Sequence, residues 1–165
     1  MLKFKDQCQR EVLLQDFPLR IVSTVPSQTE LLCDLGLEKQ LVGITAYCVH
    51  PKNLLSEKTI IGGTKNLNID LIRNLKPDLI ITADNGSTDE PRIKLLKAHG
   101  IDTIVTDHHA IALDGIPKSA VAVLNPTRDD CQFPDPYIAG CMVAWLLMAA
   151  VRKRLSESGK FTESI

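Results

Sequence analysis

The sequence is poor in several features that would each point to a particular class of protein. Aromatic residues make up only 4% of the 165 residues, which leaves few side chains on which single-stranded bases could stack. The chain has 19 Lys and Arg against 20 Asp and Glu, so its formal net charge is −1 and no global field attracts nucleic acid or an anionic membrane. We therefore expect neither a nucleic-acid partner nor a membrane partner.

Disulfides and targeting segments are also missing from the pattern. The five cysteines are odd in number and none has the C-x-x-C spacing, which argues against a disulfide framework or a structural zinc site. Charged residues interrupt residues 1–18, so no signal-peptide core is found there, and the apolar run over residues 142–151 is too short to span a bilayer. These features predict a cytoplasmic protein with free thiols.

Short β-rich segments alternate with helical segments along most of the chain. Strands are predicted at residues 19–25, 41–45, 59–61, 78–82, 101–106 and 120–124. Helices are predicted at residues 27–36, 69–76, 91–99 and 139–155. This alternation is typical of right-handed βαβ crossovers, which build a mostly parallel, doubly wound sheet with helices on both faces. We expect one three-layer, Rossmann-like α/β domain over residues 1–165.

Three further structural expectations follow from local patterns. Residues 2–7 and 11–14 can pair as an antiparallel β-hairpin at a sheet edge. Trp145 falls within the apolar part of the last predicted helix, and we expect it in the core. Exposed sheet edges can pair between two copies of a chain, so we also expect that a homodimer can form.

Candidate metal ligands follow two of the predicted strands. Asp84 comes after strand 78–82, and Asp107, His108 and His109 come directly after strand 101–106. The carboxyl ends of neighbouring parallel strands meet at one edge of a sheet, where ligands bind. Carboxylate oxygen and imidazole nitrogen suit manganese, iron or zinc, so these four residues can form a divalent-metal site. The alternative is that they serve as ordinary turn and cap residues.

The end of the first predicted strand offers different chemistry. Ser27 and Gln28 lie at the start of the following helix, whose free N–H groups can bind an anion. The alternative for Ser27 is a plain helix N-cap. The segment supplies only one carboxylate, Glu30, a turn inside the helix, which is a thin supply of ligands for a two-metal site.

Two halves of the chain carry two different resemblances. The stretches FKDQCQREVLL, RIVSTVPSQTELLCDLGLEKQLVGIT, CVHP and IIGGTKNLNIDLIRNLKPDLIIT resemble the N-terminal lobe of periplasmic cobalamin- and iron-chelate-binding proteins of ABC importers. This resemblance covers residues 1–82. It implies a corrinoid- or chelate-binding module, in which a partner copy would supply the second lobe of the cleft.

The second resemblance covers residues 79–155. The stretches LIITADNG, AHGIDTIVTDHHA and IPKSAVAVLNPTRDDCQFPDPYIAGCMVAWLLMAAVRKRL resemble RecJ-type DHH phosphoesterases, which are manganese-dependent single-strand DNA exonucleases. The resemblance implies that Asp84 and His108 are metal ligands, with Asp107 and His109 in the same constellation. The aspartate-rich strand end that forms this family's first motif has no counterpart in the sequence.

The two resemblances overlap in PDLIIT, a strand that fits either family. We expect a recombined chain, a chimera of two doubly wound fragments, made either deliberately or by natural gene fusion. Such a chain would have no complete native active site, and folding rather than catalysis would be its main property. The alternatives are a weak manganese-dependent phosphoesterase or exonuclease fragment and the corrinoid- or chelate-binding module.

Overall fold

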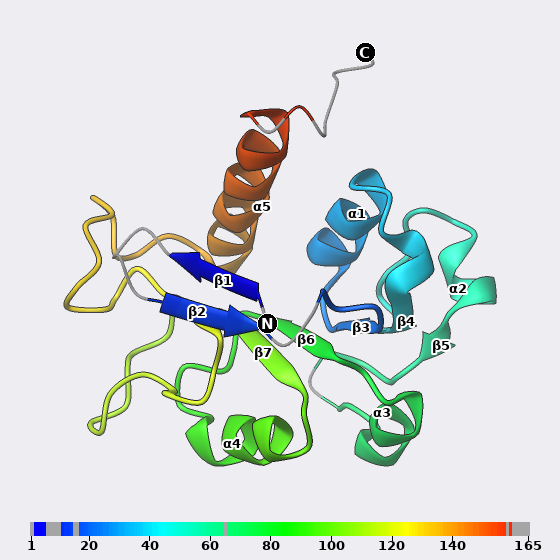
Figure 1. Ribbon diagram of the computed structural model, residues 1–165, viewed down its shortest axis with the longest axis horizontal. Coiled ribbons are helices and arrows are strands. Elements are labelled where there is room, and N and C mark those ends of the chain that lie inside the picture. Colours follow the sequence, from blue (N-terminus) through cyan, green and yellow to red (C-terminus); the bar gives the residue numbers. More distant parts are fainter. Residues whose placement is uncertain (1, 6–10, 15–16, 65, 158, 160–165) are drawn as a thin grey trace.

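The centre of the molecule is a six-stranded parallel sheet with helices on both faces (Figure 1). The computed structural model describes all residues except 1, 6–10, 15–16, 65, 158 and 160–165. The strands are β3 (Ile21–Ser23), β4 (Leu41–Ile44), β5 (Thr59–Ile60), β6 (Leu79–Ala83), β7 (Asp102–Thr106) and β8 (Ala122–Leu124). The helices are α1 (Pro26–Asp34), α2 (Leu54–Glu57), α3 (Ile69–Leu75), α4 (Glu90–Ala98) and α5 (Gly140–Glu157), with a short 3₁₀ turn at Glu38–Gln40.

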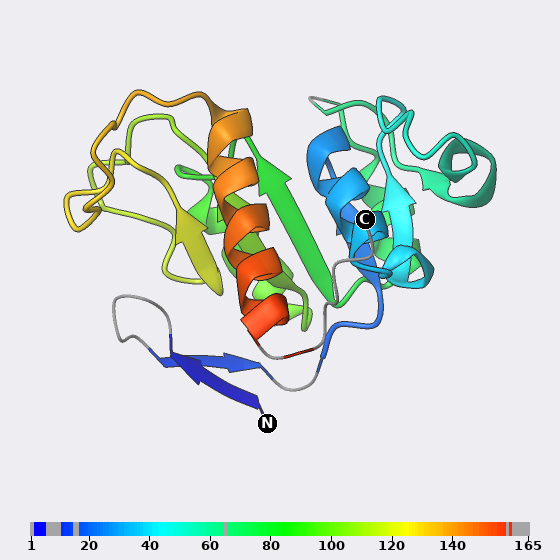
Figure 2. The ribbon, with the colours of Figure 1, turned by 90° about the horizontal axis from the view of Figure 1, so that it is seen from above.

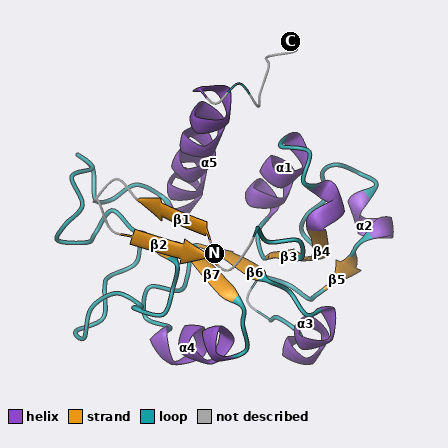
Figure 3. Cartoon of the chain, in the orientation of Figure 1, coloured by secondary structure: helices purple, strands orange, loops and turns teal. Residues whose placement is uncertain are grey.

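The strand order makes the sheet doubly wound. The order is β5-β4-β3-β6-β7-β8, and every neighbouring pair is parallel. From β3 the chain winds outward to β5, and then it returns to β6 and winds the other way. Helices α1 and α5 lie on one face, and α3 and α4 lie on the other (Figures 1 and 3). The predicted α/β class and mostly parallel sheet are therefore confirmed.

The apolar strand residues divide between the two faces because successive side chains of a strand point in opposite directions. Ile21 of β3 packs in a cluster with Leu32 of α1, whereas the next residue, Val22, packs with Ile72 of α3. Such strands are buried on both sides, so they appear in the sequence as continuous apolar runs rather than as an alternating pattern. This is why the short β-rich runs could be predicted.

Two expectations about packing are corrected by the structure. Trp145 is 55% exposed, because the face of α5 that carries it turns away from the sheet while Val143 and Ala144 are buried. The N-terminal hairpin exists, but β1 (Leu2–Lys5) and β2 (Glu11–Leu14) form a separate two-stranded antiparallel sheet instead of extending an edge of the main one (Figure 2). The Gln7 end of the predicted hairpin lies outside the described residues.

The described cysteines are all free thiols. Cys48 is buried, Cys33 and Cys131 are partly buried and Cys141 is exposed, whereas Cys8 lies outside the described residues. Among the helices that the structure describes, none is long and apolar enough to cross a membrane.

Burial predicts how two substitutions will differ in stability. Ile44 is fully buried, so Ile44→Ala is expected to lower the free energy of unfolding by about 2–5 kcal/mol. Trp145→Ala is expected to cost less than about 1 kcal/mol, because more than half of the side chain already faces solvent. Urea denaturation of both variants measures the difference, and equal losses would contradict the placement of Trp145.

Candidate metal centre

The candidate site lies where the winding of the sheet reverses. β3 and β6 are neighbours, but their connections run to opposite faces of the sheet (Figure 1), and in such sheets ligands bind beyond the carboxyl ends of the strands at this point. Asp84 directly follows β6 at this point. Asp107, His108 and His109 directly follow β7, the next strand in the sheet. The topology therefore brings two segments that are more than twenty residues apart in sequence to one edge.

Asp84 is held in an uncommon backbone conformation. Its φ angle is 60°, in the left-handed region that few residues other than glycine, asparagine and aspartate adopt. Its backbone N–H donates to the Thr106 carbonyl oxygen at 2.9 Å, so the β6–β7 ladder continues one residue beyond the strands. The following loop is anchored because Thr82 Oγ1 donates to the Asn85 carbonyl oxygen at 2.9 Å. This turn places the Asp84 side chain beside the end of β7.

Three of the four predicted ligands are brought together. Asp84, His108 and His109 each offer one ligand atom, and these atoms lie within 4.8 Å of one another. The Asp84 Oδ1 to His108 Nε2 distance is 2.9 Å, and the two imidazole ring centres are 4.7 Å apart. Two imidazoles and one carboxylate with open faces form a ligand set that non-haem iron and catalytic zinc sites use.

Asp107 lies behind this cluster. The residue is only 1% exposed, and its Oδ1 accepts a hydrogen bond from His109 Nδ1 at 2.7 Å. The same oxygen accepts from the backbone N–H of His108 at 2.8 Å, and Oδ2 accepts from the Ser87 N–H at 2.9 Å. Because a carboxylate can only accept, a neutral His109 ring would carry its proton on Nδ1 and a lone pair on Nε2. Asp107 thus orients a candidate ligand, in the way that carboxylates do behind many metal-bound histidines.

The environment of Asp107 shifts two pKa values in opposite directions. Burial by itself raises the pKa of Asp107, but the hydrogen bonds from the His109 side chain and from Ser87 together outweigh it and hold this pKa below its ordinary value. The hydrogen bond to Asp107, followed by the negative charge of the same carboxylate, raises the pKa of His109. The pair therefore favours a charged Asp107.

A second set of polar residues supports the site and was missed at the sequence level. Asn125, just after β8, donates from Nδ2 to Ser87 Oγ at 2.7 Å and to the His109 carbonyl oxygen at 2.8 Å. Its Oδ1 accepts from the backbone N–H of Thr127 at 2.9 Å. Asn125 thereby connects the ends of three segments. The signal in the sequence was a polar residue at the end of a strand, in the stretch LNP.

Ser27 and Gln28 do not join the metal cluster. Helix α1 begins at Pro26 with Val25 in the N-cap position, so the alternative role of Ser27 as N-cap is wrong. Gln28 is buried, and its Nε2 donates to the Thr82 carbonyl oxygen and to Thr106 Oγ1, both at 3.1 Å. Its amide thus links α1 to the ends of β6 and β7, and anion binding at this helix start stays a prediction.

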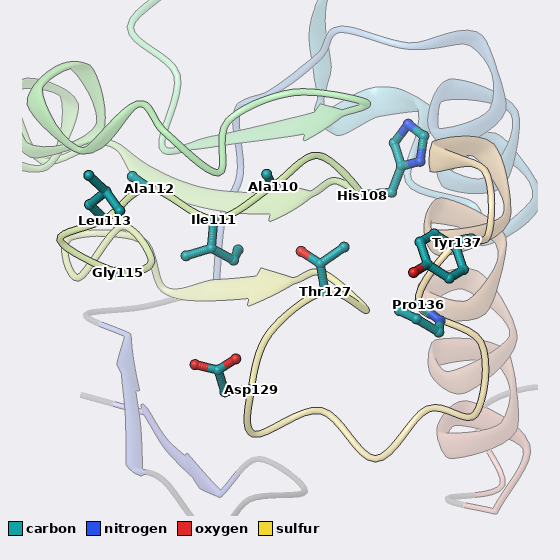
Figure 4. Close-up of a pocket in the computed structure, with 10 residues that line it drawn as sticks. All are labelled: His108, Ala110, Ile111, Ala112, Leu113, Gly115, Thr127, Asp129, Pro136 and Tyr137. Carbon is teal, nitrogen blue, oxygen red and sulfur yellow. The ribbon is translucent and has the colours of Figure 1, made fainter.

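A groove of about 770 Å³ runs from His108 along the loops that follow β7 and β8 (Figure 4). The residues that line it are His108, Ala110, Ile111, Ala112, Leu113, Gly115, Thr127, Asp129, Pro136 and Tyr137. Tyr137 lies at the His108 end of the groove, and Leu113 lies at the other end (Figure 4). Both are strongly exposed. The groove is mostly apolar, and the side chain of Asp129 is its acidic group.

The fold and the cluster define a doubly wound α/β protein with a carboxylate–histidine centre at its switch point. The model of the DHH family, N-terminal domain, matches residues 8–165, so this chain belongs to the DHH family. That match also takes in most of the half that resembles the binding proteins.

Known proteins are similar to the chain in both ways. A stretch of 95 residues is 40% identical to the single-stranded-DNA-specific exonuclease RecJ of Salmonella typhimurium. This stretch covers 58% of this chain and 16% of that protein. A stretch of 115 residues is 33% identical to the ABC transporter substrate-binding lipoprotein YvrC of Bacillus subtilis. This stretch covers 69% of this chain and 36% of that protein. The chain thus spans well under half of either relative, and the similarity to both families that the sequence indicated is confirmed.

A solved structure shares the fold. The molybdate periplasmic binding protein MolA of Haemophilus influenzae superposes with a TM-score of 0.50 and 22% identity, covering 79% of this chain and 40% of that one. This likeness concerns the arrangement of helices and strands alone.

The Asp107 network predicts a pH-dependent effect of Asp107→Asn. The variant is expected to lose about 1–3 kcal/mol of stability near neutral pH, because an amide cannot accept all of these hydrogen bonds. The contribution of Asp107 is present above about pH 4 and is lost as the pH falls through its lowered pKa. The contribution of His109 is present below about pH 6.5 and is lost as the pH rises through its raised pKa.

Two measurements check this prediction. NMR titration of the ring protons should show the pKa of His109 falling toward its ordinary value in the Asp107→Asn protein. Urea denaturation as a function of pH should show the largest stability difference from the unaltered chain between about pH 4 and pH 6.5. Asp114→Asn, an exposed site in the neighbouring loop, is the control. An unchanged pKa of His109 would contradict the assigned role of Asp107.

Proposed function

We propose that this chain binds one divalent transition-metal ion through Asp84, His108 and His109, and that the centre supports slow hydrolysis of small phosphodiesters. The observation that carries the proposal is the convergence of three ligand atoms within 4.8 Å at the switch point of the sheet. Membership of the DHH family and the similarity to an exonuclease support phosphodiesters as the substrate class.

The residues present suit such an ion. One carboxylate oxygen and two imidazole nitrogens match manganese, iron or zinc, and the Asp84 and His109 side chains are well exposed. When bound, a divalent ion supplies Lewis-acid polarisation of a phosphoryl oxygen and lowers the pKa of water. The protein holds its ligands ready, because Asp107 fixes the ring of His109 and the sheet fixes the backbone of Asp84.

The same geometry supports a single ion and a low rate. A two-metal site needs ligands from several strand ends, and the end of β3 supplies no carboxylate. Thr24 donates to the Ile81 carbonyl oxygen, Gln28 is engaged with β6 and β7, and Glu30 is exposed on α1. The first strand end is thus used for packing. We infer that the lack of ligands at this strand end limits the rate of hydrolysis.

The groove beside His108 supports a small ester rather than a long polynucleotide. Ile111, Leu113 and Tyr137 give it apolar walls that can take the organic group of an ester. Asp129 is exposed in the same groove and disfavours an extended run of phosphates. The net charge of −1 provides no attraction that would offset this repulsion.

We infer that the chain combines two ancestries joined near β6. β6 pairs with β3 of the binding-protein-like half on one side and with β7 of the DHH-like half on the other. A junction within this strand keeps both pairings and the helices on either side. The similarities to a substrate-binding lipoprotein and to an exonuclease support this origin. Such a junction would leave the fold intact, but the end of β3 would no longer carry the carboxylates that complete a two-metal site.

A second candidate function, binding of a corrinoid or a metal chelate, is favoured by the similarity to the substrate-binding lipoprotein. Tyr47 and Val49, which follow β4 at the same edge of the sheet, are exposed apolar side chains that a large ring could cover. Titration with cobalamin, followed by visible absorbance and by size-exclusion mass, tests this candidate. A spectral change with doubling of mass would support it, and an unchanged spectrum at millimolar protein would exclude it.

The metal proposal predicts a specific response to manganese. After chelator treatment, manganese at about 100 times its dissociation constant should stabilise the chain by about 2.7 kcal/mol, seen as a higher melting temperature. Manganese should also support hydrolysis of bis(p-nitrophenyl) phosphate above the buffer rate. At this manganese concentration Asp84→Asn and His108→Ala should each abolish both responses, because losing one of three ligands raises the dissociation constant well above it.

Asp114→Asn is the matched control for the loss of one acidic group, since Asp114 is exposed and lies outside the cluster. This control should keep both responses. A melting temperature that manganese leaves unchanged would overturn metal binding. Stabilisation without hydrolysis would retain the metal site and overturn the activity.

A further inference from the structure

Gly140, the first residue of α5, is buried against the carboxylate of Asp84. A Cβ atom placed on Gly140 would lie 2.5 Å from Asp84 Oδ1, 3.0 Å from its Cγ and 3.1 Å from its Cβ. Real Cβ atoms essentially never lie within 3.0 Å of another heavy atom in this way, so something would have to move. Oδ1 is also the atom that lies 2.9 Å from His108 Nε2. A side chain at Gly140 would therefore displace the carboxylate from its position in the cluster.

The conformation of the backbone gives no other reason for a glycine at this position. Six of the nine glycines have a positive φ, whereas Gly43, Gly63 and Gly140 do not. Alanine could therefore adopt the backbone of Gly140, and within a helix alanine is generally favoured over glycine. The close approach of Asp84 is the feature that excludes a side chain.

Asp84 cannot simply move away from a larger neighbour. Its backbone N–H is bonded to the Thr106 carbonyl oxygen, and its φ of 60° already lies in a restricted region. Rotation about χ1 would take Oδ1 away from Gly140 but also away from His108. The start of α5 also carries the positive end of the helix dipole, which favours a carboxylate at this place.

We propose that Gly140 is a positioning residue of the metal centre: by lacking a side chain, it lets the start of α5 close on Asp84 and hold the carboxylate against His108. This inference rests on the proposed metal site and adds to it a residue from a third element, which donates no ligand. It makes α5 the wall that fixes the direction of the Asp84 side chain.

Cobalt(II) is the probe, because its visible absorption bands report ligand number and geometry, and the full chain is used throughout. Gly140→Ala is expected to weaken cobalt affinity about 10- to 100-fold, the loss typical of removing outer support from a ligand, and to change the band positions or intensities. The control is Gly43→Ala in β4. Its Cβ would lie 2.8 Å from Leu75 Cδ1 and 2.9 Å from Ile61 Cγ2, in the core and away from the cluster. This variant should lower the melting temperature and leave the cobalt affinity and spectrum unchanged.

A double-variant cycle separates positioning from a general loss of stability. In an Asp84→Ala background, adding Gly140→Ala should change cobalt affinity by less than about twofold, because the group that it displaces has been removed. If Gly140→Ala alone does not fold, the double variant should recover a cooperative melting transition for the same reason.

The outcomes are distinct for the two proposals. An unaltered chain that takes up no cobalt overturns the metal site and this inference with it. A chain that binds cobalt while Gly140→Ala binds it equally well overturns the role of Gly140 alone. The role is also overturned if Gly43→Ala weakens cobalt affinity to the same extent, if the effect of Gly140→Ala persists in the Asp84→Ala background, or if an unfolded Gly140→Ala is not recovered in the double variant.

Discussion

The parallel pairing of β6 with β7 is the interaction on which the rest of the site depends. In this register Ala83 pairs with Thr106, so the residues that follow the two strands, Asp84 and Asp107, emerge side by side. The bond from the Asp84 N–H to the Thr106 carbonyl oxygen extends this pairing beyond the strands. A slip of one residue would turn Asp84 to the other face of the sheet. The position of the carboxylate is therefore a consequence of strand register.

At this edge of the sheet, the polar groups that hold the strands and α1 together lie next to the candidate metal site. Thr106 Oγ1 donates to the Thr82 carbonyl oxygen, and both oxygens accept a hydrogen bond from Nε2 of Gln28 in α1. Asp107 receives N–H groups from Ser87 and His108 as well as the ring of His109. Buried polar groups of this kind are stable only when their partners are present. The half of the chain that resembles binding proteins is thus connected to the DHH-like half through hydrogen bonds next to the candidate metal ligands.

Much of the fold could be predicted because parallel strands buried on both faces appear as apolar runs, and because turns and glycines separate them from helices. The helix at Leu54–Glu57 was missed, since four residues are too few to show a helical period. Trp145 was misplaced for a different reason. An almost wholly apolar helix does not reveal which of its faces meets the sheet, and the packing of α5 decides it.

For the site, the sequence by itself determined the kinds of candidate ligand, since Asp84, His108 and His109 stand where strands end and offer oxygen and nitrogen donors. Only the tertiary structure decided how they are used. Asp107 precedes two candidate ligands in sequence, yet burial and its hydrogen bonds turn it toward His109 and out of the cluster. The contact between Gly140 and Asp84 joins residues more than fifty positions apart, and no local pattern marks it. Such roles arise from distances between elements, which exist only once the sheet and its helices have packed.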